Sequence, residues 1–152
     1  MNRVVNRRMI RVRRGFTLLE IMLVVGLLAL LAAGVIPALI ERSKNAKIDL
    51  ARSQVGPNGS LSTTIEQYKL DTDTWPETLK DLSEKPSDEL VASKWRGPYI
   101  KNPDSMKDPW QNDFNYEGGG SATHNETQFD LWSNGPDMTS GTDDDITNWK
   151  KE

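Results

Sequence analysis

The hydrophobic residues of the chain are concentrated in one segment. Of the 25 residues 16–40, 20 are hydrophobic, and no polar side chain occurs from Ile21 to Ile36. A helix over residues 16–40 would be about 37 Å long at a rise of 1.5 Å per residue, which exceeds the roughly 30 Å of a hydrocarbon core. The pattern therefore predicts a membrane-spanning helix.

Beyond residue 40 the pattern becomes amphipathic, with one apolar face. The segment Gly56-Pro57-Asn58-Gly59 should interrupt the helix, because in a helix Pro costs about 3 kcal/mol and Gly about 1 kcal/mol relative to Ala. We expect a second helical piece to end near Leu70. Apolar residues recur at helical spacing on both sides of the break: Ile48, Ala51 and Val55 before it, and Leu61, Ile65 and Tyr68 after it.

The rest of the chain predicts short elements. Pro76, followed by Leu79 and Leu82, favours a short helix that begins at the proline. A helical turn is expected around residues 88–92. Near-alternating apolar positions in residues 114–116 and 129–132 predict two strands of a small antiparallel sheet, with Gly118-Gly119-Gly120 in the loop between them.

Charge is distributed as unevenly as hydrophobicity. The formal net charge is −3, but residues 1–14 carry six Arg and no acid, so residues 16–152 hold 13 Lys and Arg against 22 Asp and Glu, a net of −9. Basic flanks stay cytoplasmic, which places the acidic body on the far side of the membrane. The alternative is an ordinary secretory signal peptide cut after Ala33 or Ala38, but the apolar run is longer than usual and contains a carboxylate.

That carboxylate is Glu20. An acid at membrane depth costs roughly 2.5–3.5 kcal/mol and normally needs a partner. If the chain were cut after Gly15, the new α-amino group of Phe16 would lie one helical turn from Glu20, within this chain or on a neighbouring copy. Alternatively, Glu20 lies in the headgroup region near Arg13 and Arg14.

Several kinds of chemistry are excluded or not indicated. The chain has no Cys and a single His, His124, which excludes disulfides, Cys/His zinc sites and thiol nucleophiles. No G-x-S-x-G motif and no phosphate-binding loop occurs, so we expect no enzymatic activity. Five Trp are expected to supply core area in a body poor in aliphatic residues. A carbohydrate-binding platform is the alternative, but no organised polar grid accompanies them in the sequence.

The run Gly15-Phe16-Thr17-Leu18-Leu19-Glu20 resembles the G-F-T-L-x-E signature of class III signal peptides, found in type IV pilins and in the pseudopilins of type II secretion. The resemblance implies cleavage between Gly15 and Phe16 by a prepilin peptidase, and N-methylation of Phe16. It also implies that Glu20 pairs with a neighbouring subunit's N-terminus during assembly. Pro37 falls where this family often has a helix-kinking proline.

Motifs in the body resemble those of the major pseudopilins. Tyr68-Lys69-Leu70-Asp71 with Trp75-Pro76 is similar to the end of the family's long helix, and Lys107-Asp108-Pro109-Trp110 to its D-P-W run. The resemblance implies an α+β, type IV pilin-like fold with a long N-terminal helix on a small domain with an antiparallel sheet. The Gly56–Gly59 segment resembles an insertion, because the family's helix is usually uninterrupted there.

An acidic loop precedes the C-terminus. Residues 137–145 contain four carboxylates and no Lys or Arg, in a surrounding rich in Gly, Pro, Ser and Thr. A hard divalent cation would relieve this crowding, and Ca²⁺ suits a flexible loop of oxygen ligands better than Mg²⁺. The order of residues is not that of an EF-hand, and the alternative is a solvated acidic turn.

The loop also resembles the calcium loop of the type II major pseudopilins, through S-x-G-P-D-(x)6-D-D-I-x-N-W. That match implies side-chain ligands from Asp137, Asp144 and Asp145. Backbone carbonyls of Asn134, Thr139 and Thr142 would complete the shell. Asp143 stands where the family often has Asn.

Together these observations predict a structural subunit of a type II secretion pseudopilus. Its parts would be a cleaved leader (1–15), a transmembrane and assembly helix (16–40) and a periplasmic domain (41–152). We expect a homopolymer formed through the N-terminal helices, with prepilin peptidase, minor pseudopilins, the inner-membrane assembly platform and the membrane itself as partners, and no nucleic acid. A type IV pilin, a minor pseudopilin, or a secreted binding protein or enzyme are the alternatives.

Overall fold

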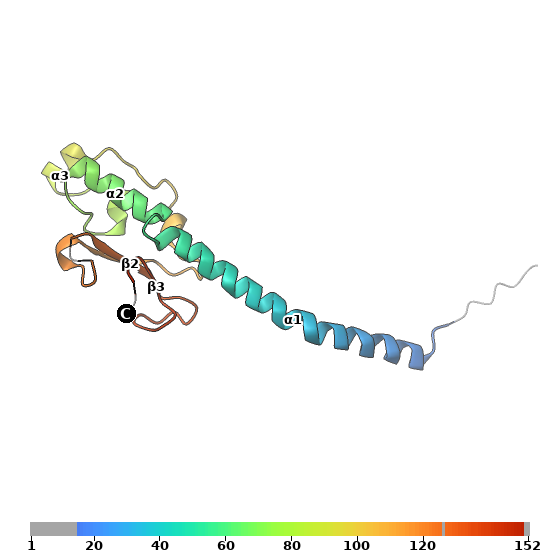
Figure 1. Cartoon of the computed structure of the whole chain (residues 1–152). Helices are drawn as coiled ribbons and strands as arrows, with labels where there is room; N and C mark the ends of the chain where they lie inside the picture. The colour runs from blue at the N-terminus through green and yellow to red at the C-terminus, as the bar shows by residue number, and fades with distance from the viewer. Residues whose placement is uncertain (1–14, 126, 151–152) are drawn as a thin grey trace, which may run out of the picture. The chain divides into compact units, whose positions relative to one another are not determined.

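The computed structural model describes residues 15–125 and 127–150, so the predicted leader, apart from Gly15, lies outside the described residues. The chain divides into two compact units, Met1–Ile40 and Glu41–Glu152. Figure 1 shows the order of the elements along the chain. They are α1 (Leu18–Val55), α2 (Ser60–Thr72), the 3₁₀ helix η1 (Leu79–Leu82), α3 (Glu89–Lys94), the 3₁₀ helix η2 (Pro103–Met106), β1 (Asn115–Gly118), the 3₁₀ helix η3 (Gly119–Ser121), β2 (Phe129–Ser133) and β3 (Ile146–Thr147).

The first unit contains the apolar part of α1. The stretch Leu18–Thr72 includes a window of 18 residues with a mean hydropathy of 2.7, none of it buried within the protein. The large side chains of this part, from Leu18 to Ile40, are exposed. The helix continues through Pro37, although proline has no N–H for the bond to the preceding turn. The predicted helix is confirmed, and its length and composition suffice to cross a membrane.

The predicted helix break is confirmed between α1 and α2. The N–H of Gly56 donates to the Arg52 carbonyl at 2.8 Å, and that of Gly59 donates to the Gly56 carbonyl at 2.7 Å. A Cβ atom on Gly59 would lie 2.3 Å from the carbonyl oxygen of Gln54, so the turn has no room for a side chain. The second helix runs to Thr72, slightly past the predicted end.

The second unit is organised around the apolar face of these helices. A buried cluster brings together side chains from α1, α2, η1, β2 and the segments that connect them. Trp75 and Trp95 pack against this cluster, so the interpretation of the Trp residues as core material holds for them. The cluster consists of Val55, Leu61, Ile65, Tyr68, Leu82, Ile100, Phe114, Phe129 and Leu131.

The sheet has three antiparallel strands in the order β1-β2-β3. Asn115 pairs with Trp132 and Gly118 with Phe129, while Trp132 also pairs with Thr147. The two predicted strands are confirmed, but the two-residue strand β3 was not predicted, because two residues are too few to show an alternating pattern.

The prediction of a helix beginning at Pro76 was wrong by three residues. Thr78 and Asp81 form a reciprocal capping box, and the 3₁₀ helix η1 begins at Leu79. The Asp81 carboxylate accepts the N–H groups of Glu77 and Thr78, at 2.8 and 3.0 Å. The capping side chains therefore determine where this helix begins. The expected turn near residue 88 is α3, which Asp88 caps.

Replacing Ile65 by Ala should lower the free energy of unfolding by about 2–5 kcal/mol, because this side chain is fully buried and its loss leaves a cavity. Leu70→Ala in the same helix is the matched control, since Leu70 is 75% exposed, and its effect should stay within about 0.5 kcal/mol. Denaturant unfolding of the processed chain in micelles measures both. Equal losses from the two variants would contradict the assignment of the core face.

Candidate functional sites

The acidic residues lie in the loop that joins β2 to β3, and the loop closes on itself at Gly135. This residue has φ +67°, and a Cβ atom there would lie 2.3 Å from the carbonyl oxygen of Asp144. Only glycine allows the two ends of the loop to approach so closely. The carboxylates predicted to bind calcium are thereby held within one closed loop.

Asp144 joins the two sides of this loop. Its Oδ2 accepts the N–H of Asp137 at 3.1 Å, and its Oδ1 accepts the Thr142 hydroxyl at 2.6 Å. The hydrogen bond from Thr142, together with that from the Asp137 backbone, lowers the pKa of Asp144 below its ordinary value. The carboxylate is therefore charged at neutral pH.

The other two predicted carboxylate ligands also bind backbone N–H groups of the loop. Oδ1 of Asp137 accepts the N–H of Thr139 at 2.8 Å, and Oδ2 of Asp145 accepts the N–H of Gly141 at 2.7 Å. The remaining oxygen of Asp145, Oδ1, is buried and has no hydrogen-bond partner. A buried carboxylate oxygen without a donor needs a cation or a polar partner.

The predicted carbonyl ligands belong to the same loop. The Thr139 carbonyl lies 3.1 Å from the Thr142 hydroxyl, and the Thr142 carbonyl accepts the N–H of Asp145 at 3.3 Å. Asn134 stands at the start of the loop, where its Oδ1 accepts from Asn115 Nδ2 at 2.6 Å.

The predicted ligands suit calcium chemically, because every one of them is an oxygen atom. One of these atoms, Oδ1 of Asp145, has no hydrogen-bond partner. Among residues 15–125 and 127–150, no group of three or more acidic or His side chains is arranged to hold a metal ion. The carboxylates are instead engaged with the loop backbone. A bound ion would therefore depend on backbone carbonyls as much as on side chains.

The buried side chain of Asp108 stabilises the start of this loop. The sequence did not reveal that role. Asp108 is only 2% exposed, and its Oδ2 accepts the Ser133 hydroxyl at 2.7 Å. Its Oδ1 accepts the N–H groups of Trp110 and Asn112, both at 2.9 Å. The Ser133 oxygen in turn accepts the N–H of Gly135 at 3.2 Å. The D-P-W run was a signal for this residue, but its contact with Ser133 exists only in the tertiary structure.

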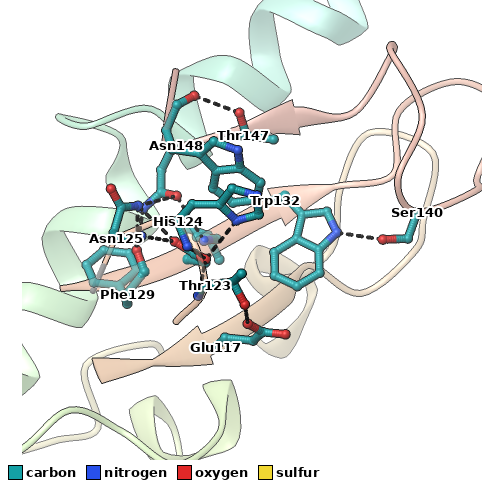
Figure 2. Close-up of polar contacts among 12 residues, drawn as sticks. Glu117, Thr123, His124, Asn125, Phe129, Trp132, Ser140, Thr147 and Asn148 are labelled. Atoms are coloured by element: carbon teal, nitrogen blue, oxygen red, sulfur yellow. Dashed lines mark hydrogen bonds and ion pairs between the residues drawn. The ribbon is translucent and has the colours of Figure 1, made fainter. Parts of the chain in front are cut away.

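A second polar cluster surrounds Asp130 on β2, and the sequence did not single it out. Figure 2 shows Thr123, His124 and Asn125 close together. The Asp130 side chain is 1% exposed. Its oxygens accept the backbone N–H groups of all three residues, at 2.8 to 2.9 Å. His124 Nδ1 lies 3.0 Å from Oδ2, and the imidazole ring stacks on Trp149 at 4.1 Å between ring centroids.

The electrostatics of this cluster favour the charged carboxylate. Burial by itself raises the pKa of Asp130, but the hydrogen bonds from the backbone and side chain of His124 and from the backbone of Asn125 and Thr123 outweigh burial, so the pKa lies below its ordinary value of 3.8. Asp130 thus fixes the loop that leads into β2.

At the other end of the described chain, Thr17 and Glu20 cap the start of α1. The N–H of Glu20 donates to Thr17 Oγ1 at 3.2 Å, and the N–H of Thr17 donates to Glu20 Oε2 at 3.4 Å. This is a reciprocal capping box. Gly15 and Phe16, between which cleavage is predicted, precede the helix and are exposed among the described residues.

The fold and the N-terminal segment place the chain in a class of protein, the pilin-like subunits with an N-terminal methylation motif. The family described as the prokaryotic N-terminal methylation motif matches residues 10–36. The structure also matches the crystal structure of the major pseudopilin from the type 2 secretion system of enterohaemorrhagic Escherichia coli. That match has a TM-score of 0.58 and 28% identity and covers 73% of this chain and 89% of the other.

Within this class, the chain belongs to the type II secretion system protein G family, whose model matches residues 38–149. The type II secretion system core protein G of Escherichia coli K12 is 38% identical over 141 residues, which cover 90% of this chain and 91% of that protein. The core protein G of Pseudomonas aeruginosa is 35% identical over 146 residues, with 91% and 96% coverage. The predicted fold, a type IV pilin-like α+β domain behind a long apolar helix, is confirmed.

The lowered pKa of Asp130 predicts a pH dependence of stability. A carboxyl that is more acidic in the folded chain stabilises it above the unfolded pKa, and this contribution is lost as the pH falls through the folded value. The free energy of unfolding should therefore fall more steeply between about pH 5 and pH 2 in the native chain than in Asp130→Asn. Asp104→Asn, at an exposed position, is the control and should keep the native slope. Identical slopes in all three proteins would contradict the role of Asp130.

Proposed function

We propose that this pseudopilin is the repeating structural subunit of a periplasmic pseudopilus. The single observation that carries the proposal is that a chain of the protein G family has an exposed helical segment that is apolar except for one carboxylate, Glu20, in its first turn. Such a surface is stable only in a membrane or against other apolar helices. Both surroundings would be used in turn, the inner membrane before assembly and the filament core after it.

Processing would prepare the helix for this exchange. A prepilin peptidase would cut between Gly15 and Phe16, and the basic leader would hold the N-terminus on the cytoplasmic side, with residues 41–152 in the periplasm. The methylation motif at residues 10–36 supports this step. The new α-amino group of Phe16 would then provide a positive charge for the Glu20 carboxylate of an adjacent subunit.

The subunit would act mechanically. Addition of subunits by the inner-membrane assembly platform and its cytoplasmic ATPase would lengthen the filament, which pushes folded proteins toward an outer-membrane channel. Minor pseudopilins would occupy the tip. The chain itself would be noncatalytic, and its acidic domains would face outward from the filament.

We also propose that the loop of residues 134–145 binds Ca²⁺. The side chains of Asp137, Asp144 and Asp145 and the carbonyls of Asn134, Thr139 and Thr142 would hold the ion. The unsatisfied Oδ1 of Asp145 supports the proposal. Because this chain has no Cys, an ion is the available cross-link for a loop with little apolar burial.

Replacing Glu20 by Gln tests the pairing role of its charge. A Gln side chain can still accept the N–H of Thr17, so the capping box persists while the negative charge is lost. Cleavage by prepilin peptidase should proceed normally, but the amount of filament recovered by pelleting should fall at least about tenfold.

Thr17→Ala is the matched control for Glu20→Gln. It removes the other half of the capping box and keeps the carboxylate, so it should assemble nearly as well as the native chain. A normal filament yield from Glu20→Gln would refute the pairing role, whereas a low yield from both variants would assign the effect to the helix start.

Thermal unfolding with and without a chelator tests the calcium proposal. Saturating Ca²⁺ at about 100 times its Kd should stabilise the native chain by about 2.7 kcal/mol, so the chelator should lower its Tm. Asp137→Ala and Asp145→Asn should unfold at a lower temperature and lose the response to the chelator, while Asp104→Asn should keep it. An unchanged Tm of the native chain with and without chelator would overturn the proposal.

A further inference from the structure

The Asp130 cluster and the acidic loop line an open pocket that has no role in filament assembly as proposed above. Its volume is about 840 Å³, which lies within the roughly 300–1,000 Å³ typical of ligand sites. Its lining combines two indole rings, Trp132 and Trp149, with acceptors and donors that include Glu117, His124 and Lys150. Unlike Trp75 and Trp95, neither of these two indoles packs against the hydrophobic core.

The aromatic part of the pocket forms a corner. The rings of Trp132 and Trp149 lie 5.7 Å apart at an interplanar angle of 71°, so their faces point in different directions. His124 stacks on Trp149 with an interplanar angle of 8°. Indole faces carry negative charge density, which attracts the polarised C–H groups on the face of a sugar ring.

The walls of this corner are held in place by hydrogen bonds within the protein. The indole N–H of Trp132 donates to Ser140 Oγ at 3.0 Å, and the Thr147 hydroxyl donates to the Trp149 carbonyl at 2.8 Å. Figure 2 shows the Trp132 and Ser140 contact beside the Thr123 hydroxyl, which donates to Glu117 Oε2 at 3.4 Å. Ligand binding would therefore cost little ordering of side chains.

The polar groups suit a ligand with many hydroxyls better than an anion. Because Asp130 can only accept, its contact with His124 Nδ1 places the hydrogen on that nitrogen, and the other ring nitrogen, Nε2, remains to accept in the neutral ring or donate in the cation. Glu117 offers carboxylate oxygens and Lys150 an ammonium group. The lining also includes the carboxylates of Asp130, Asp143 and Asp145, so an anion would be repelled. Hydroxyl groups can donate to carboxylates and accept from Lys150.

We infer that this pocket binds a short glycan, with a pyranose ring against Trp132 and its hydroxyls on Glu117 and His124. A carbohydrate-binding platform was only the alternative interpretation of the Trp residues in the sequence, because the polar residues that accompany these two indoles, from residues 117–130 and 140–150, meet only in the folded domain. In the folded domain, β1, β2 and the acidic loop place polar groups around the two indoles, an arrangement that could not be seen in the sequence. None of the lining residues belongs to α1 or α2.

Binding of defined trisaccharides tests the inference. The processed chain, in a detergent without a sugar headgroup, is titrated calorimetrically with triacetylchitotriose, cellotriose and maltotriose up to about 10 mM. At least one should bind saturably, and saturation-transfer NMR should show its ring protons in contact with the protein. The acidic loop forms one wall of the pocket. The sugar titrations are therefore repeated with Ca²⁺ and with chelator, to separate this site from the proposed calcium site.

Two variants and their controls decide whether this pocket is responsible for the sugar binding. Trp132→Ala and Glu117→Gln should each weaken binding at least about tenfold, or 1.4 kcal/mol. Trp132→Phe keeps an aromatic face and should retain most of the affinity, and Trp110→Ala, outside the pocket lining, should bind as the native chain does. Absence of saturable binding by all three sugars overturns the inference. The inference is also overturned if binding survives Trp132→Ala and Glu117→Gln, or if trilysine binds more tightly than any sugar.

Discussion

The structure depends on the burial of one helical face. Val55, Leu61, Ile65 and Tyr68 pack with residues of β2, and this contact gives the small domain its core. Helix α1, which supplies Val55, begins as an exposed apolar helix at Leu18. Burial by the protein's own domain thus stops near Ala51, and the apolar surface before it must be covered by lipid or by other copies of the chain.

The break at residues 56–59 is compatible with this arrangement because the apolar face continues across it. Ser62 Oγ donates to the Val55 carbonyl at 2.8 Å and satisfies one of the last carbonyls of α1. The close approach of Gly59 to Gln54 keeps the turn compact. The glycines and the proline of this turn therefore interrupt the backbone hydrogen bonds of the helix without dividing the hydrophobic core.

The body has few apolar residues, and buried carboxylates take over part of the structural role. Asp108 and Asp130 are almost completely buried and have no Lys or Arg partner among the described residues, yet each accepts several backbone N–H groups or hydroxyls. Such hydrogen bonds to a charged acceptor are stronger than neutral ones. They fix the D-P-W turn, the approach to β2 and the base of the acidic loop.

The sequence by itself determined the apolar helix, its lone carboxylate, the break at Gly56–Gly59 and the core positions of α2, because periodicity and composition are local properties. It also indicated the acidic loop by its composition. The start of η1 at Leu79 is also local, because the capping box of Thr78 and Asp81 sets it. Only the tertiary structure decided that Asp108 holds Ser133, and that Trp132 and Trp149 share a pocket with His124. These features arise from contacts between residues far apart in the chain, and a pattern read along one segment contains no information about the partner on another.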